Sequence, residues 1–335
     1  MKMADICSEK VFIVAEIGNN HEGDFELAKK LIIEAANAGV DAVKFQTCNP
    51  ELFISSSDQE RIKRLKQFQL NNKQLIELSL LAKNLGIIFF STPFDFQSAE
   101  FLNQIQAIFK ISSGDNTFSP LIKKIANYGK PTIVSTGMLN MDGVRTLYRQ
   151  WNEFGGNIKN LCLMHCISSY PAPINEVCLS AITAMKQEFP EVIIGYSDHA
   201  LGIEAAILSV IAGARIIEKH FTIDKNHSDF RDHQLSANPS EMAILVSEVR
   251  RLTTIYGNGT KEIQECELSM KPLMRRSVAA SENLAPGKII SNENIVWLRP
   301  GTGLQTGQED LVLGKKLNRL VSKGELIKIE FIDNS

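Results

Sequence analysis

The stretch Gly213-Ala-Arg-Ile-Ile-Glu-Lys-His-Phe-Thr222 begins as an apolar strand and ends in three consecutive ionisable residues. Burying such groups is costly unless they find partners, so a strand with this ending is typical of a functional site. The stretch Val192-Ile-Ile-Gly-Tyr-Ser-Asp-His199 has a similar design. His199 and His220 thus end two successive predicted strands. They predict a metal-binding pair if the fold brings the strand ends together.

The same unit, a short apolar run followed by an amphipathic segment, recurs along the chain. Nearly continuous apolar runs predict buried parallel strands, and apolar residues at three and four spacing predict helices between them. Eight such units in about 250 residues have the size of an α/β protein with a (β/α)₈ TIM barrel. An open doubly wound sheet is the alternative, but no Gly-x-Gly-x-x-Gly follows the first strand. The predicted strands are 11–17, 41–46, 87–91, 107–111, 131–136, 161–166, 192–196 and 214–220.

The sequence divides into a barrel and a smaller C-terminal part. Residues 1–256 hold the eight units and a last predicted helix. Residues 257–276 are polar and open with the turn sequence Gly257-Asn-Gly-Thr260, which predicts a linker. Residues 277–335 contain short β-type runs separated by Pro-Gly and Lys-Gly turn signals, which predict a small, mostly β domain.

One connection, residues 48–71, is longer than the others. Its middle, Asp58-Gln-Glu-Arg-Ile-Lys-Arg-Leu-Lys66, is highly charged. We favour a solvated helix there. The alternative is a flap over the mouth of the barrel, because long loops at that position often cover sites.

Composition narrows the partners and the location. The net charge of -2 gives no basic field for nucleic acid or an anionic membrane. The first apolar run is too short for a signal peptide or a membrane span, so we expect a cytoplasmic protein. None of the six cysteines forms a Cys-x-x-Cys pair. A zinc site at Cys162, His165 and Cys166 is disfavoured because its spacing fits no zinc pattern.

The predicted strands all end in polar residues, and in TIM barrels the chemistry lies at these ends. His199 and His220 could hold a divalent ion that acts as a Lewis acid. Glu16, Asp115 and Asp232 are candidates for proton transfer or for binding sugar hydroxyls. Two lysines and four hydroxyl groups form a lining that suits a phosphate- and carboxylate-bearing ligand, namely Lys44, Lys110, Thr92, Ser113, Ser135 and Ser197.

Each of these residues also has a structural explanation. Lys219 and Glu218 could simply pair with each other, and serines after strands commonly cap the next helix. The remaining histidines are expected to be ordinary hydrogen-bonding residues rather than ligands. It is the gathering of so many polar groups at one end of the predicted barrel that indicates a site.

Nine motifs in order resemble the sialic acid synthase family, which makes nonulosonic acids from phosphoenolpyruvate and an N-acetyl hexosamine. Residues 277–335 resemble the antifreeze-like (SAF, β-clip) domain of that family, with Trp297-Leu-Arg-Pro-Gly301 as the marker. The motifs are Phe12-Ile-Val-Ala-Glu-Ile-Gly-Asn-Asn-His21, Val43-Lys-Phe-Gln46, Ser91-Thr-Pro-Phe94, Lys110-Ile-Ser-Ser-Gly114, Ser135-Thr-Gly-Met138, His165-Cys166, Tyr170-Pro171, Gly195-Tyr-Ser-Asp-His199 and Glu218-Lys-His-Phe-Thr222.

The resemblance implies a role for each candidate. His199 and His220 would hold Mn²⁺ or Mg²⁺, and the lysine-and-hydroxyl lining would hold phosphoenolpyruvate. Glu16 and Asp115 would be the catalytic carboxylates, with the tasks of acid and base left open between them. Arg299 would reach into the barrel of a second copy, which implies a domain-swapped homodimer. The implied acceptor-binding residues are Gln46, Ser168, Tyr170, Asp232 and Arg299.

The departures from the family pattern lie on the acceptor side. Asp115 replaces the usual glutamate, and Ser168 stands where asparagine is common. The loop 224–232 lacks the usual Pro-Gly-Pro and contains Arg231. Phosphoenolpyruvate is therefore the firmer expectation of the two substrates. The acceptor could be N-acetylmannosamine, a diacetamido-trideoxyhexose or, given Arg231, a charged sugar such as a 6-phosphate.

Two other functions compete with this synthase. One is another phosphoenolpyruvate-dependent condensation that forms a 3-deoxy-octulosonate or heptulosonate, but the C-terminal domain with Arg299 argues against it. The other is a sugar-binding barrel without catalysis. The presence of Lys44, Lys110, His199 and His220 argues against an inactive barrel.

Overall fold

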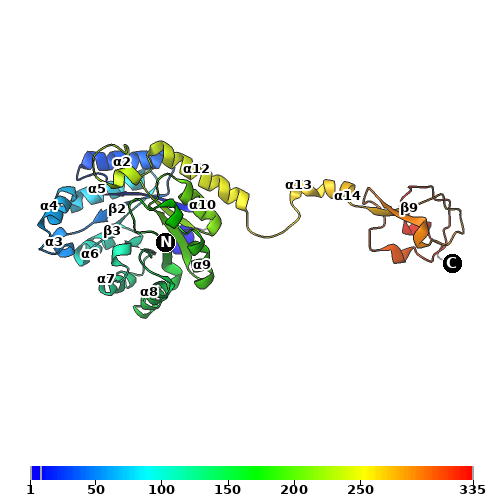
Figure 1. The fold of residues 1–335 in the computed structure, drawn as a ribbon, viewed down its shortest axis with the longest axis horizontal. Coiled ribbons are helices and arrows are strands. Elements are labelled where there is room, and N and C mark those ends of the chain that lie inside the picture. The colour runs from blue at the N-terminus through cyan, green and yellow to red at the C-terminus, as the bar shows by residue number, and fades with distance from the viewer. Residues whose placement is uncertain (1, 8–9, 334–335) are drawn as a thin grey trace. The chain divides into compact units, whose positions relative to one another are not determined.

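The computed structural model describes residues 2–7 and 10–333 of the chain (Figure 1). The chain separates into two compact units between Gly257 and Asn258, and each is described by itself. In the part of the chain that the structure describes, no helix combines the length and the apolar character needed to cross a membrane.

The first unit is the predicted TIM barrel. Its eight strands pair only in parallel, in the order β3-β2-β1-β8-β7-β6-β5-β4, and β3 and β4 contact each other to close the ring. All eight predicted strands are confirmed, with ends that differ by one or two residues. The strands are β1 Phe12–Gly18, β2 Ala42–Thr47, β3 Ile88–Pro93, β4 Phe109–Ile111, β5 Thr132–Ser135, β6 Leu161–Cys166, β7 Ile193–Asp198 and β8 Ile216–His220.

Helices surround this barrel (Figure 1). They bury their apolar faces against the outer side of the strands, which forms one layer of the core. Capping side chains fix several helix starts, for example Asp24 before α2 and Asn238 before α12. The helices are α2 Phe25–Asn37, α5 Asn72–Asn84, α6 Phe96–Ile105, α7 Ser119–Ala126, α8 Met141–Glu153, α9 Ser180–Glu188, α10 Glu204–Ala212 and α12 Pro239–Tyr256, with 3₁₀ turns at η1 Ser113–Asp115, η2 Ile158–Asn160 and η3 Ile174–Glu176.

A second apolar layer fills the N-terminal half of the barrel interior. The short helix α1 Met3–Ile6 contributes Met3 and Ile6 to this layer, where they pack among inward-facing side chains such as Phe12 and Ile216. The barrel is therefore a packed core at this end, and its open space lies at the other.

The long β2–α5 connection folds into α3 Pro50–Phe53 and α4 Gln59–Phe68. The predicted helix is confirmed, Asp58 caps it, and most of its residues are exposed to solvent as the favoured interpretation requires. One side of α4 also lines the pocket described below, which agrees with the flap alternative. A further short helix, α11 Asp232–Leu235, follows β8.

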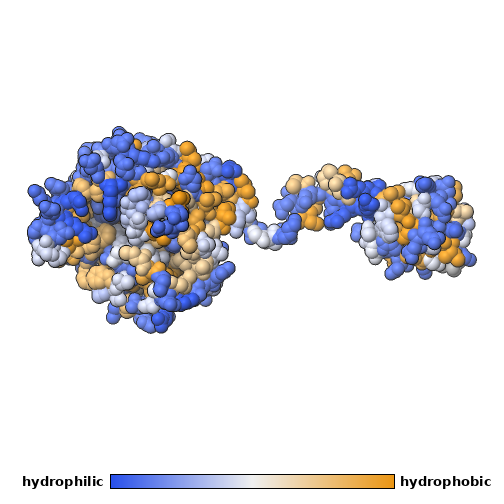
Figure 2. All heavy atoms as spheres, viewed as in Figure 1, coloured by the Kyte–Doolittle hydropathy of each residue, from blue (hydrophilic) through white to orange (hydrophobic). Residues whose placement is uncertain are grey.

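The surface of the barrel unit carries an apolar region around α10 and α12 (Figure 2). Leu208, Ile211, Ile244 and Ile255 are all more than two-fifths exposed. Contiguous exposed apolar patches often mark protein–protein interaction sites.

The second unit is small and mostly irregular β structure. Strands β9 Ser277–Ala280 and β10 Ile295–Leu298 pair antiparallel around an apolar core that includes Val278, Val312 and Ile327. Two short helices, α13 Glu265–Leu268 and α14 Met270–Met274, lie within the segment predicted as a linker. The 3₁₀ turns of this unit are η4 Asn292–Asn294, η5 Glu309–Leu311 and η6 Ile329–Phe331.

Candidate active site

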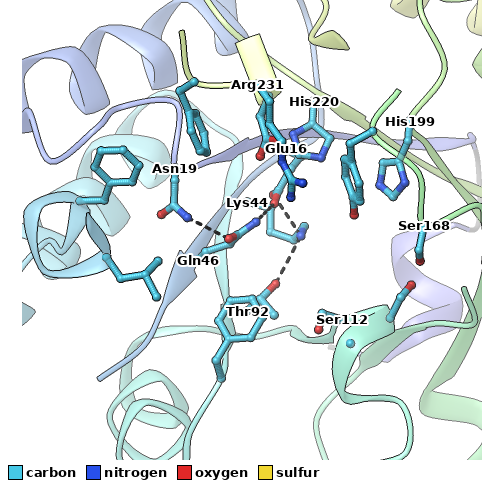
Figure 3. A pocket seen from close by; sticks show the side chains of 18 of the residues that line it. Glu16, Asn19, Lys44, Gln46, Thr92, Ser112, Ser168, His199, His220 and Arg231 are labelled. Carbon is cyan, nitrogen blue, oxygen red and sulfur yellow. Dashed lines mark hydrogen bonds and ion pairs between the residues drawn. The ribbon is translucent and has the colours of Figure 1, made fainter. Parts of the chain in front are cut away.

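A cavity of about 1,100 Å³ lies at the C-terminal ends of the barrel strands (Figure 3). It brings together thirteen of the fifteen residues that the sequence singled out for a site. These are Glu16, Lys44, Gln46, Thr92, Lys110, Ser113, Ser135, Ser168, Tyr170, Ser197, His199, His220 and Asp232.

The alternation of side chains along each strand explains this gathering. On β8, Ile216 belongs to the apolar layer inside the barrel, so Glu218 and His220 share its face and point into the cavity. On β2, Ala42 is inside, and Lys44 and Gln46 follow on the same face. The inner face of each strand therefore changes from apolar to polar where the packed core ends.

The two cavity lysines are deeply buried, with 4% of Lys44 and 3% of Lys110 exposed. The Lys44 Nζ lies 3.0 Å from Glu16 Oε2 and 3.4 Å from Glu218 Oε1, and it donates to Thr92 Oγ1 over 3.3 Å. Burial lowers the pKa of Lys44, but the two carboxylates outweigh burial and hold that pKa above its ordinary value. The neighbouring carboxylates therefore favour the protonated form of Lys44, whose contacts are drawn in Figure 3.

Lys110 has one carboxylate neighbour, whereas Lys44 has two. Its Nζ donates to Ser135 Oγ over 2.7 Å and lies 3.7 Å from Glu218 Oε1. Burial, with repulsion from Lys44, lowers the pKa of Lys110, and Glu218 opposes the fall. Removal of that carboxylate would therefore make Lys110 easier to deprotonate.

The pKa values of two cavity carboxylates, Glu16 and Glu218, are shifted in opposite directions. Burial raises the pKa of Glu16 to about 7, although Lys44 opposes this. Burial also acts on Glu218, but Lys110 and Lys44 together hold its pKa below the ordinary value. Glu218 is thus the fixed counter-charge of the lysine pair, and Ser197 Oγ donates to it over 3.1 Å.

The possible pairing of Lys219 with Glu218 is wrong. The Lys219 Nζ lies 3.0 Å from Asp198 Oδ2, and it also donates to the carbonyl oxygen of Ala200. Neighbouring residues of a strand point to opposite faces, so Lys219 leaves the cavity where Glu218 enters it. The sequence could have assigned Glu218 to the site by this alternation alone.

The two histidines fit a divalent ion. Their ring centroids are 5.6 Å apart, and both line the cavity. His199 Nδ1 donates to the carbonyl oxygen of Ile167 over 2.6 Å, so the lone pair that a metal would need is on Nε2, which lies 3.5 Å from Ser197 Oγ. Burial lowers the pKa of both rings, which keeps them neutral as ligands must be.

The surroundings of His220 also fit a divalent ion. Its Nδ1 is buried and has no hydrogen-bond partner among the described residues. No cluster of three or more His, Cys, Asp or Glu side chains suited to a metal occurs in residues 2–7 and 10–333. An ion at this pair would therefore take its remaining ligands from substrate and water.

The acceptor residues predicted from the resemblance lie beside this pair. The centroids of the Tyr170 and His199 rings are 4.3 Å apart, and Arg231 Cζ lies 4.9 Å from the Tyr170 centroid. The Arg231 Nε is 3.3 Å from Asp232 Oδ1. Gln46 Nε2 donates to Glu16 Oε1 over 2.9 Å, which joins the acceptor side to the lysine cluster.

Two predicted residues are not part of this lining. Asp115 lies in η1 and its carboxylate accepts from Ser112 Oγ over 2.8 Å, while Ser112 to Gly114 line the cavity. Burial raises the pKa of Asp115. Arg299 is an exposed residue of the second unit. Both therefore remain predictions.

The mouth of the cavity contains residues that the motifs did not indicate. They come from α4 and from the loop between β8 and α11, and Phe68 meets Phe230 edge-on with centroids 5.3 Å apart. No periodicity predicts such a meeting, since it depends on how two loops fold over the barrel. These residues are Arg61, Arg64, Leu65, Phe68, Asp229 and Phe230. Arg231, already noted as a departure from the family pattern, lines the cavity with them, as do Asn19 and Glu22.

The family of the chain follows from its sequence match over the barrel. Residues 31–261 match the model of the NeuB family. The chain belongs to the NeuB family. Residues 275–332 of this NeuB-family chain match the SAF domain, as the resemblance implied.

Several of its relatives are named synthases. The N,N'-diacetyllegionaminic acid synthases of Campylobacter jejuni and Legionella pneumophila are 37% and 38% identical to it, over 96% of the chain and 99% and 94% of their own lengths. The N-acetylneuraminate-9-phosphate synthase of Homo sapiens is 31% identical over 96% of the chain and 93% of its own length.

A solved structure agrees with these relatives. The N-acetylneuraminic acid (sialic acid) synthetase of Leptospira borgpetersenii, in complex with citrate, is 37% identical and superposes with a TM-score of 0.74. The match covers 78% of this chain and 90% of that one. The resemblance to the sialic acid synthase family is confirmed.

Proposed function

We propose that this NeuB-family chain is a nonulosonic acid synthase. It condenses phosphoenolpyruvate with an open-chain N-acetyl hexosamine and releases phosphate by C–O cleavage. The observation that carries the proposal is the single cavity in which two buried lysines lie beside a neutral histidine pair. The names of the relatives, which are nonulosonic acid synthases, support it.

The deep side of the cavity is the phosphoenolpyruvate site of this proposal. Lys44 and Lys110 neutralise the phosphate and carboxylate charges, and hydroxyl groups of Thr92, Ser113, Ser135 and Ser197 supply hydrogen bonds. The phosphate becomes the leaving group, so the lysines stabilise the charge that changes most during the reaction.

The reaction has four parts. The methylene carbon of phosphoenolpyruvate attacks the aldehyde carbon of the sugar, and the aldehyde oxygen becomes an alkoxide that is protonated. Water adds to the neighbouring, cation-like carbon and loses a proton. The tetrahedral intermediate then expels phosphate. A divalent ion, Mn²⁺ or Mg²⁺, held by His199 and His220 would supply Lewis-acid polarisation of the aldehyde.

Glu16 and Asp115 are the proposed carboxylates for the two proton transfers. Glu16 lies in the cavity between Lys44 and Gln46, within reach of both substrates. Asp115 lies in η1 beside the cavity, so its participation requires a shift of that turn or an intervening water. We therefore assign the leading role to Glu16.

The acceptor side of the proposal comprises Gln46, Ser168, Tyr170 and Asp232. Arg299 would enter from a second copy in a domain-swapped homodimer, for which the apolar surface around α10 and α12 offers an interface. In this arrangement residues 1–256 are the synthase domain, 257–276 the linker and 277–335 the SAF domain.

All six cysteines are free thiols, as expected for an enzyme of the reducing cytoplasm.

The test is phosphate release from phosphoenolpyruvate with Mn²⁺ and a panel of acceptors, with products identified by mass spectrometry. The panel contains N-acetylmannosamine, its 6-phosphate, a 2,4-diacetamido-trideoxyhexose, arabinose 5-phosphate and erythrose 4-phosphate. We expect a nine-carbon sugar acid from an N-acetylated hexose. Release with only the unacetylated pentose or tetrose phosphates would overturn the proposal, and so would no release with any acceptor.

A further inference from the structure

A buried ion pair lies behind the two histidines of the cavity. Asp198 precedes His199 in the sequence and Lys219 precedes His220, and both charged side chains are fully buried. The two histidines line the cavity (Figure 3), whereas their neighbours along the strands point to the opposite face. The ion pair therefore lies on the outer face of the strands, where the surrounding helices pack.

This pair is bonded to the backbone on both sides of His199. The Lys219 Nζ lies 3.0 Å from Asp198 Oδ2, and it donates to the carbonyl oxygen of Ala200 over 2.5 Å. The Ala200 N–H in turn donates to Asp198 Oδ1 over 2.9 Å. The residue before His220 thus grips the residue before His199 and the residue after it.

The strand ladder alone does not fix how far the two histidines lie from each other. The paired register of β7 and β8 ends at Asp198 and Lys219. His199 is bonded to the connection after β6, through Nδ1 and the carbonyl oxygen of Ile167 over 2.6 Å, whereas His220 pairs with β1 on the other side. The contacts of Lys219 join these two segments directly behind the cavity.

Stability is a weak reason for such a pair. Removing two charges from water costs several kcal/mol per ion, and their attraction offsets this only with excellent geometry, so buried ion pairs often add little to the free energy of unfolding. Groups that orient metal-binding histidines from behind have a clearer effect, since their loss typically lowers metal affinity about 10- to 100-fold.

We propose that Asp198 and Lys219 are positioning residues for the divalent ion. They hold the backbone around His199 to the residue before His220 and thereby set the separation of the two ligand rings. The inference rests on the proposed function, in which this histidine pair holds Mn²⁺ or Mg²⁺, and it assigns residues that do not touch the ion.

The experiment titrates Mn²⁺ alone into metal-free enzyme and follows free Mn²⁺ by its electron paramagnetic resonance signal. For Lys219→Met we expect the Kd of Mn²⁺ to rise about 10- to 100-fold, because the separation of the rings is no longer held. Charge alone predicts the opposite sign. Loss of Lys219 leaves the Asp198 carboxylate without its counter-charge, and an unpaired negative charge near the site attracts a cation.

Asp198→Asn removes the other partner and is also expected to weaken Mn²⁺ binding. The two substitutions change the charge in opposite directions, so a loss of affinity in both is a geometric effect. Lys219→Arg retains the charge and the donors, and its Kd should stay within about fivefold of the wild type. Lys219→Gln, which keeps a donor without the charge, serves if Lys219→Met does not fold, with the same sign expected.

Arg250→Met is the matched control at the opposite end of the barrel. Arg250 Nη2 lies 2.7 Å from Asp41 Oδ2, and Arg250 Nη1 donates to the carbonyl oxygen of Val11, so this cation has the same two kinds of partner as Lys219. Its loss should leave the Kd of Mn²⁺ within about twofold, since distant sites act independently. Thermal melting of each metal-free variant measures any general loss of stability.

Three results would overturn the positioning role. They are unchanged or tighter Mn²⁺ binding in Lys219→Met and Lys219→Gln, a loss in Arg250→Met equal to that in Lys219→Met, and no Mn²⁺ binding by the wild type. The last result would also remove the ion from the proposed function. Failure of the synthase itself is a separate result, seen as no phosphate release with any acceptor, whereas Mn²⁺ affinity reports on the histidine pair alone.

Discussion

The deep and outer parts of the cavity are built in different ways. The deep part is made of strand residues, and its lysines are buried and matched by Glu16 and Glu218. The mouth is made of α4 and the β8–α11 loop, and its arginines are exposed. Hydrogen-bonded strands hold the first set in register, whereas loop contacts hold the second.

On the proposed function, this difference separates the chemistry from the choice of acceptor. The groups proposed to act on phosphoenolpyruvate lie on strands of the barrel. The groups at the mouth lie on a helix and a loop, and loops tolerate replacement. Variants of the two parts should therefore differ in kind: deep ones should lower turnover with every acceptor, and outer ones should change the ranking of acceptors.

The largest effect is expected from loss of the proposed metal-binding histidines, because the ion they would hold lies between the deep and outer parts of the cavity. Polarisation of a carbonyl by a metal supplies several kcal/mol, so His220→Ala should lower kcat/KM by roughly 10³-fold or more with every acceptor. Chelation by EDTA should do the same to the wild type, and Mn²⁺ should restore it. His227→Gln, an exposed histidine outside the cavity lining, is the control. Full activity of metal-free enzyme would remove the metal from the reaction.

The next largest effect is expected for Lys110→Met. Loss of one preorganised charge at the leaving phosphate should lower kcat/KM for phosphoenolpyruvate by about 10²- to 10³-fold. The KM of the acceptor should change little, because Lys110 lies on the deep side. Steady-state kinetics with each substrate varied in turn measures both, and Lys159→Met on the surface is the control. An effect confined to the acceptor KM would contradict the division of the cavity.

An intermediate effect is expected for Glu218→Gln. This change removes the counter-charge that keeps Lys110 protonated against burial and Lys44. Lys110 is active when protonated, below its pKa, and activity falls as pH rises through that pKa. The alkaline limb of kcat/KM for phosphoenolpyruvate should therefore move to lower pH, with a loss of about tenfold at pH 8. Glu218→Asp should restore part of the activity lost at pH 8. If the alkaline limb does not move in Glu218→Gln, Glu218 does not keep Lys110 protonated.

The smallest effect is expected for Phe68→Ala, which removes the contact between α4 and Phe230. An edge-to-face aromatic pair contributes about 0.5–1.5 kcal/mol, so the acceptor KM should rise about two- to tenfold. The KM of phosphoenolpyruvate and the kcat should stay near their wild-type values. Leu52→Ala, an exposed residue of α3, is the control. A fall in kcat equal to that of Lys110→Met would show that the mouth is not separate from the chemistry.

The sequence predicted the deep part well, for a physical reason. Period-two alternation and the rule that barrel sites lie at strand ends suffice to place Lys44, Lys110 and His220 on one inner surface. The same alternation places Glu218 and Lys219 on opposite faces of the strand. The expectation that these two neighbours pair with each other did not take it into account. Local patterns determine these positions because each strand can bury only one of its faces in the barrel.

The sequence indicated the mouth only in part, through the flap alternative for residues 48–71 and through Arg231. The charge run of α4 predicts a helix, but its amphipathic pattern does not say which structure its Arg61 side meets. That depends on the contact of Phe68 with Phe230, two residues far apart in the chain. Asp115 illustrates the same limit at shorter range: it follows a strand end as expected, yet the turn η1 directs it beside the cavity rather than into its lining.

The apolar filling of the N-terminal half of the barrel has a kinetic consequence. Met3 and Ile6 pack with the inward side chains there, so the cavity is deep and is entered from the loop side. A molecule that occupies the outer part of the cavity would lie between solvent and the deep lysines. Phosphoenolpyruvate is therefore expected to bind before the sugar in an ordered sequence, and the sugar, once bound, would delay its escape.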